Sequence, residues 1–269
     1  MSRVSVVVLF ILCFLTHYAL GEECDSVLVI GRGISEIPAG AYRDREDIAE
    51  VRFETASSLT SIGDYAFLGC VNLRRITLPA SLRELGEGCF RECAALREVD
   101  LPSGLTRLPA YLFYFCEGLE RVGLPARLVK IERGCFGYCR RLERIIFPAS
   151  LTGIGMNAFS CCDALEEVMV PRSVTYLESY AFSDCRGLKR ITMPSNGKEL
   201  GELILSGCDS LEEIVELSRT PPAFECNSFL FDPDEKDRYA DVILKVSKGC
   251  KATYRHARAW RLFELIEEN

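Results

Sequence analysis

Apolar positions recur along this chain with a fixed step of 23 residues. In each copy a leucine stands three positions after a cysteine, and an aromatic residue stands three positions before it, except in the last copy, which has Leu205. The first regular copy shows this pattern in Phe67, Cys70 and Leu73, and Ile76 and Pro79 follow at the same spacing. Self-similarity with a period of about 20 to 29 residues predicts structural units that bury their apolar edges by stacking on their neighbours.

Each copy also contains the pattern of a short strand. Side chains alternate across a strand, so we expect Leu73, Ile76 and Leu78 to face the core while Arg75 and Thr77 face solvent. The following proline ends the strand because it has no N–H group for the next ladder bond. The sequence therefore predicts a leucine-rich repeat solenoid, in which short parallel strands stack into a right-handed, curved coil with a cap at each end.

The repeat runs through the middle of the chain without a linker rich in glycine, serine or proline, which favours one domain. We expect the solenoid to span residues 22–219. It begins with a worn copy at about 34–58, which lacks the cysteine and the proline, and the regular copies occupy about 59–217. Residues 220–269 are expected to form a C-terminal capping segment, because the end of a solenoid needs a unit that covers the core.

The repeat and the ending together resemble a known family. The copy reads Ile62-Gly63-x-x-Ala66-Phe67-x-x-Cys70-x-x-Leu73-x-x-Ile76-x-Leu78-Pro79, which resembles the BspA-like leucine-rich repeat family of bacterial and protist surface proteins. Tyr254, Trp260, Phe263 and Ile266 are similar to that family's closing segment, although Ser247 stands where a proline is common. The resemblance implies a secreted or surface-displayed interaction module, with relatives linked to adhesion, and no particular ligand.

The N-terminus matches a secretory signal peptide over residues 1–21. Arg3 precedes an apolar stretch, and Ala19 and Gly21 are small residues at the positions that signal peptidase requires. A membrane anchor is the alternative, but about twelve apolar residues are too few to span a bilayer. We expect cleavage after Gly21 and a mature chain that is released from the cell or held at its surface through another protein.

Charge narrows the class of partner. The chain has 32 basic and 39 acidic residues, a formal net charge of -7, and no block of lysine or arginine. This balance argues against nucleic acid and anionic membranes, because both repel an acidic protein. The expected partner is a protein or a cell-surface ligand, with no membrane insertion.

One cysteine per regular copy gives a cysteine ladder, which consists of Cys70, Cys93, Cys116, Cys139, Cys162, Cys185 and Cys208. Successive sulfurs would lie one coil apart, at a distance that a disulfide can span, but parallel Cα–Cβ vectors make the required torsion awkward. We therefore favour buried structural thiols that act as small hydrophobic groups.

Other cysteines suggest one cross-link and no metal site. Cys226 and Cys250 both lie in the capping segment, where a disulfide would hold a unit that is stacked on one side only. Cys161 and Cys162 are adjacent but lack the paired Cys-x-x-Cys units or histidines that zinc requires. We expect no metal and no cofactor.

Catalytic residues are equally scarce. His256 is the one histidine left once the signal peptide is removed, so a catalytic triad or dyad would have to be built around it. The acidic pair Glu166 and Glu167 recurs with the repeat, and its spacing therefore reflects the coil and not a hydrolytic site. We expect a protein that is not an enzyme.

The exposed strand positions provide the candidate binding site. Ile146 and Met169 occupy consecutive copies of a slot that the period places in solvent, next to an opening left by a glycine. Apolar residues bordered by charge are typical of protein contacts. Our hypothesis places Ile146 and Met169 at the centre of a binding face, with Arg121, Arg144 and Glu167 as its rim. The alternative is that a loop or a dimer partner covers the patch.

Two functional classes follow. The first is a secreted or cell-surface protein that mediates protein–protein or cell-adhesion contacts through its strand face. The second is a structural or self-assembling extracellular protein, in which copies join into a homo-oligomer or a coat. The repeat reports how the backbone stacks, so it does not select the ligand.

Overall fold

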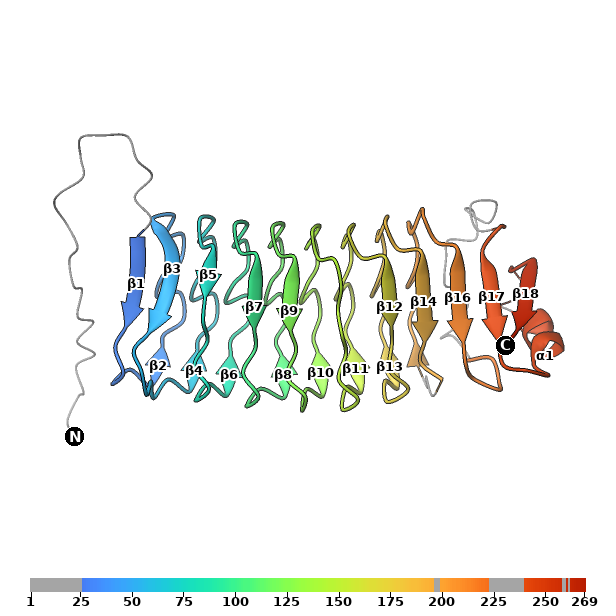
Figure 1. Ribbon diagram of the computed structural model, residues 1–269, viewed down its shortest axis with the longest axis horizontal. Helices are drawn as coiled ribbons and strands as arrows, with labels where there is room; N and C mark the ends of the chain where they lie inside the picture. Colours follow the sequence, from blue (N-terminus) through green and yellow to red (C-terminus); the bar gives the residue numbers. More distant parts are fainter. Residues whose placement is uncertain (1–25, 196–198, 223–239, 258–259, 261) are drawn as a thin grey trace.

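The structure is a computed structural model that describes residues 26–195, 199–222, 240–257, 260 and 262–269. It shows one row of stacked coils, in which β1 lies at one end and α1 (Lys251–His256) lies at the other (Figure 1). Strands occur in two columns along this row, and the coils between them are turns and short extended segments. The parallel-strand solenoid predicted from the repeat is therefore confirmed.

The first column contains the longer strands. They are β1 (Ser26–Ile30), β3 (Ile48–Phe53), β5 (Arg75–Ile76), β7 (Glu98–Asp100), β9 (Arg121–Gly123), β12 (Glu167–Met169), β14 (Arg190–Met193), β16 (Glu213–Glu216), β17 (Ile243–Val246) and β18 (Leu265–Glu268). All pairings are parallel, in the orders β1-β3-β5, β7-β9 and β12-β14-β16-β17-β18.

The second column contains strands of two residues each. They are β2 (Glu36–Ile37), β4 (Ser61–Ile62), β6 (Glu84–Leu85), β8 (Arg107–Leu108), β10 (Lys130–Ile131), β11 (Gly153–Ile154), β13 (Tyr176–Leu177) and β15 (Glu199–Leu200). They pair in parallel as β2-β4-β6 and β8-β10-β11-β13-β15. In the regular copies both columns keep the 23-residue register, as Glu98 opposite Arg121 and Ile62 opposite Leu85 show.

The core is a set of side-chain columns along the axis of the stack. The phenylalanine rings lie nearly parallel, with centroids 5.0 to 5.7 Å apart, from Phe67 through Phe90, Phe113, Phe136 and Phe159 to Phe182. All six rings have 0 % exposure. Each ring therefore packs between the equivalent rings of the coils before and after it, which is how a solenoid buries a core that no single coil could form.

The N-terminal end follows the same plan with different residues. Tyr42 stacks on Phe67 at 5.1 Å, and Ile37 pairs with Ile62, as the worn copy predicts. The strand β1 was not predicted. It adds to the sheet ahead of the worn copy, so that Leu28 lies opposite Val51.

The C-terminal segment first extends the sheet and then closes it. The strands β17 and β18 continue the ladder of β16 in register. Trp260, Tyr254 and Phe263 are buried, and α1 lies beyond β18 at the end of the row (Figure 1). The Trp260 ring N–H donates a hydrogen bond to the Pro222 carbonyl at 3.2 Å. Within the described residues, no helix is long and apolar enough to cross a membrane.

Candidate functional site

The first outward-facing column of the sheet consists of charged residues that pair between coils. Arg121 forms an ion pair with Glu98. Arg190 contacts Glu213 at 2.9 Å and Glu167 at 3.9 Å. Such exposed pairs contribute a few tenths of a kcal/mol each, about 0.2 to 1 kcal/mol by typical measurements. Their main effect here is to neutralise the charge along the face.

Arg144 differs from the other members of this column. It lies beside Arg121 in a parallel bridge, so its neighbour on that side is another cation. Across the part of the chain that the structure describes, Arg144 has no ion pair, and its residue is exposed. An unpaired guanidinium is left available for a carboxylate from outside the molecule.

The second outward-facing column contains the two most exposed large apolar side chains among the described residues. Ile146 is 75 % exposed and Met169 is 74 % exposed. One and two coils further along, Thr192 and Val215 are half-buried in the same column. In this column, the side chains of the middle coils are therefore apolar and exposed, whereas those of the C-terminal coils are half-buried.

A depression of about 470 Å³ lies next to Ile146. Its lining includes Asp100, Arg121, Gly123 and Arg144. A Cβ atom at Gly123 would run into the Asp100 carboxylate, so the absence of a side chain lets this carboxylate lie over the strand at the edge of the depression. The opening that the sequence suggested at Gly123 is therefore occupied by the Asp100 side chain, and the depression lies beside it.

The strand ladder is interrupted where the apolar pair lies. Within the described residues, 144–146 join β9 only through the single bridge at Arg144, and no pairing joins them to β12. Phe147 gives a physical reason. It stands where the adjacent coils have Leu124 and Val170, and its larger ring packs edge-on against Phe159 at 5.5 Å. Excess volume at one coil shifts the backbone that carries it.

The three rim residues and the two central residues thus lie on one face. Arg121 and Arg144 line the depression beside Ile146, and Met169 follows one repeat step later with Glu167 at the start of the same strand. Glu167 also contacts Arg190, so it is less free than Arg144 to contact a partner. The role of these five residues in binding stays a prediction.

The cysteine ladder lies inside the solenoid. Each Sγ donates a hydrogen bond of 3.0 to 3.3 Å to the carbonyl of the ladder aromatic one coil back, from Cys70 to Tyr42, Cys93 to Phe67, Cys116 to Phe90, Cys139 to Phe113, Cys162 to Phe136, Cys185 to Phe159 and Cys208 to Phe182. All seven are buried free thiols. Burial raises the pKa of Cys70 to about 11 and that of Cys139 well above its usual range. We keep their structural role as a proposal.

The structure describes only part of the residues behind the other predictions, which concern the signal peptide, the Cys226–Cys250 disulfide and metal binding. Residues 1–21 and Cys226 lie outside the described residues, so the signal peptide and the Cys226–Cys250 disulfide stay predictions. Cys250 is buried, with its thiol 4.0 Å from the Lys248 carbonyl. In the described ranges, no group of three or more histidine, cysteine or acidic residues is arranged to hold a metal ion.

Sequence reasoning missed a cluster of aromatic residues on the turns of two adjacent coils. Tyr114 packs edge-on against Phe115 at 4.7 Å and Tyr138 at 5.5 Å, and Phe115 stacks on Tyr138 at 4.4 Å. Arg91 lies over the Tyr114 ring at 5.5 Å. Phe115 and Tyr138 both have φ of 61°, a conformation that costs a bulky side chain free energy. A period search misses this cluster because these positions vary between copies.

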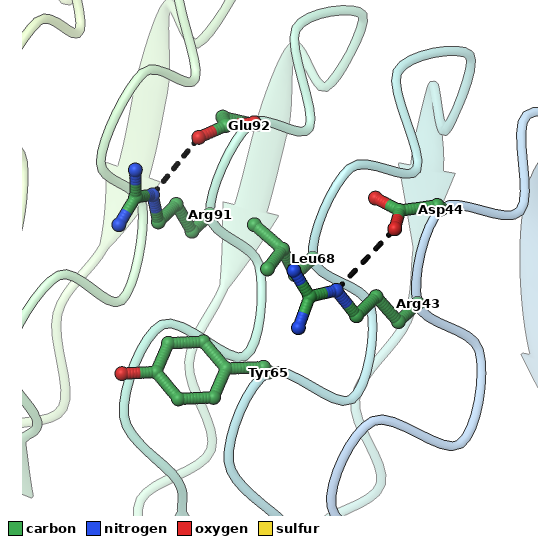
Figure 2. Close-up of a pocket in the computed structure, with 6 residues that line it drawn as sticks. All are labelled: Arg43, Asp44, Tyr65, Leu68, Arg91 and Glu92. Carbon is green, nitrogen blue, oxygen red and sulfur yellow. Dashed lines mark hydrogen bonds and ion pairs between the residues drawn. The ribbon is translucent and has the colours of Figure 1, made fainter.

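A second depression, of about 290 Å³, lies near the N-terminal end. Figure 2 shows Arg43, Asp44, Tyr65, Arg91 and Glu92 around it. Each arginine is paired with its sequence neighbour, Arg43 with Asp44 at 3.3 Å and Arg91 with Glu92 at 3.0 Å. Because these charges are already paired, this depression has fewer charged groups available to bind a partner than the strand face has.

Comparison with known structures finds the same architecture. A leucine-rich repeat protein of T. pallidum is 26% identical, with 74% of this chain and 78% of that chain covered and a TM-score of 0.52. A leucine rich cell surface protein of Faecalibacterium prausnitzii is 20% identical over 91% and 79% of the two chains, with a TM-score of 0.45. The pneumococcal vaccine antigen PcpA is 19% identical over 91% and 79%, with a TM-score of 0.48. No curated protein shows detectable similarity to the chain.

The family follows from the repeats themselves. The profile described as BspA type leucine rich repeat region (6 copies) matches residues 35–162 and 106–229. These ranges cover more than half of the chain, and they contain the worn copy, the cysteine ladder and the strand face. The chain belongs to the BspA type leucine-rich repeat family.

Proposed function

We propose that this protein is a secreted or cell-surface, non-enzymatic interaction module that binds another protein or a cell-surface component through the strand face of its middle coils. One observation carries the proposal: the two most exposed large apolar side chains among the described residues, Ile146 and Met169, follow each other along one face. They lie next to a depression of about 470 Å³.

The chemistry of this face supports binding to a macromolecule. Covering a side chain such as Ile146 or Met169 contributes roughly 1.5 to 3 kcal/mol when it is fully removed from water. Charged residues border the pair, as in protein interfaces that have an apolar centre and a polar rim. A solenoid also presents an extended surface, so a partner can contact several coils at once.

The location of the protein rests on its sequence. The predicted signal peptide at residues 1–21 directs the chain out of the cell. The ladder cysteines are compatible with an oxidising environment because burial shields their thiols from oxidants. We propose adhesion to cells or to matrix proteins as the specific role, because these are the macromolecules that surround a secreted or surface-displayed protein.

Binding of the mature chain, residues 22–269, to intact cells and to immobilised extracellular matrix proteins tests the proposal. The variant Ile146→Glu/Met169→Glu should bind at least 10-fold more weakly, because two charges replace the apolar centre. The matched control is Val29→Glu/Thr77→Glu, which adds the same charge to exposed positions of the same column, away from the patch, and should bind as the wild type does.

Circular dichroism must show that all three proteins are folded, and size-exclusion chromatography must show the same oligomeric state. Equal binding by the two variants and the wild type would contradict the proposal. So would a wild-type protein that binds neither cells nor matrix proteins. Self-association lost in the patch variant would instead identify a second copy of the chain as the partner.

A further inference from the structure

The charges around the Gly123 depression differ from those on the rest of the face. In the described part of the first strand column, Glu50 lies 3.9 Å from Arg75, Arg121 pairs with Glu98, and Lys245 contacts Glu213 at 2.5 Å. Asp100 and Arg144 form no ion pair with a described residue, although the Asp100 carboxylate acts electrostatically on Arg121, and both residues are exposed. Both also line the same depression.

Asp100 and Arg144 are too far apart to neutralise each other. Asp100 belongs to the coil before Gly123, and Arg144 belongs to the coil after it. Parallel strands are about 4.8 Å apart, so the two residues are separated by roughly 10 Å along the axis of the stack. The depression therefore carries an anion at one side and a cation at the other, with a recess between them.

The recess is bounded by apolar surface on the side of Arg144. Ile146 lies on the same coil as Arg144, and Leu124 follows Gly123 in the lining of the depression. A side chain that enters the depression would meet Ile146 on one side and, on the other, the Asp100 carboxylate that lies over Gly123. An apolar group with a charged neighbour at each side fits this surface.

We infer that the Gly123 depression receives a segment of a protein partner in which an apolar side chain stands between a basic group and an acidic group. The basic group pairs with Asp100, the apolar side chain enters the depression between the Asp100 carboxylate and Ile146, and the acidic group pairs with Arg144. This inference rests on the proposed function and adds the chemistry of the partner. Complementary charge fixes the register of such a contact.

Selection from a phage-displayed library of random peptides tests the inference. The baits are the mature protein, Arg144→Glu, Asp100→Lys and the patch variant Ile146→Glu/Met169→Glu. We expect peptides selected by the wild type to share an apolar residue flanked by one basic and one acidic residue. A selected peptide should bind Arg144→Glu at least 10-fold more weakly, and replacing its acidic residue by lysine should restore binding to that variant.

The Asp100→Lys bait supplies the reciprocal result. Binding of the same peptide should fall by a similar factor, and replacing its basic residue by glutamate should restore binding. A restored contact distinguishes charge pairing from a misfolded variant. Selected peptides that lack the charges, or that bind both charge-reversed proteins unchanged, would overturn the inference.

The patch variant separates this inference from the proposed function. If the patch variant loses the peptides while charge reversal has no effect, the face binds partners but the assigned charges are wrong. If the patch variant binds the peptides as well as the wild type does, they contact another surface, and both the inference and the proposed binding face fail.

Discussion

The phenylalanine column and the second outward column pass through the same coils, but they repeat to different degrees. The inner column has phenylalanine in six successive copies, all fully buried. The outer column changes at each copy, through Thr77, Asp100, Gly123, Ile146, Met169 and Thr192. Inside, each ring must fit the side chains on both sides, so a much smaller residue in the middle of the column leaves a void. Outside, no neighbour imposes a residue, and departures from a polar surface therefore point to function.

Truncating the inner column should have the largest effect on stability. Phe136→Ala removes a fully buried ring that stacks on Phe113 at 5.5 Å and on Phe159 at 5.0 Å. We expect the free energy of unfolding to fall by about 3 to 5 kcal/mol. The matched surface variant Ile146→Ala should change it by less than about 0.5 kcal/mol. Urea unfolding of both variants measures the difference, and similar losses would show that the two columns do not differ as described.

Glu216 is an exception to the apolar interior, because its carboxylate occupies an inward-facing position of the sheet. It lies opposite Met193 and Val246 and has 0 % exposure. The Ser218 N–H donates a hydrogen bond to its Oε1 at 2.8 Å, whereas Oε2 has no hydrogen-bond partner among the described residues. Burial raises the pKa of Glu216 to about 7 from its usual 4.5.

The raised pKa predicts how stability depends on pH. Between pH 4.5 and 7 the unfolded chain loses this proton while the folded chain keeps it, so stability falls as the pH rises through that range. A shift of this size corresponds to about 3 kcal/mol. Glu216→Gln cannot ionise, and its advantage over the wild type should grow by about 3 kcal/mol from pH 4 to pH 8. Urea unfolding at both pH values measures this, and parallel pH profiles would contradict it.

Much of the fold could be predicted because packing imposes the same residues on every coil. The step from Phe67 to Phe90 reports a stacking distance, and Tyr42 could be placed in the same column because its ring is the nearest equivalent. The strand β1 was missed because one strand at the end of a stack has no second copy to reveal a period. The run of β-favouring apolar residues from Val27 to Ile30 was the available signal.

The candidate site could be predicted only in part. The period placed Ile146 and Met169 on the surface, and the glycine beside them indicated an opening. The choice of Arg121 to pair with Glu98, which leaves Arg144 without a partner among the described residues, depends on side-chain conformation and cannot be obtained from the period. The turn aromatics Phe115 and Tyr138 were missed because their slot varies between copies, with Glu92 before them and Cys161 after them, although its backbone keeps a positive φ.

The most direct test of the central claim is photo-crosslinking from single positions on the outer column. Benzoylphenylalanine is placed at position 169, in place of Met169, or at position 77, in place of Thr77, and each mature protein is bound to cells and irradiated. The account predicts a cross-linked adduct from position 169 and little or none from position 77, although both positions are exposed. An equal yield from position 77, or no adduct from position 169 while binding persists, would contradict it.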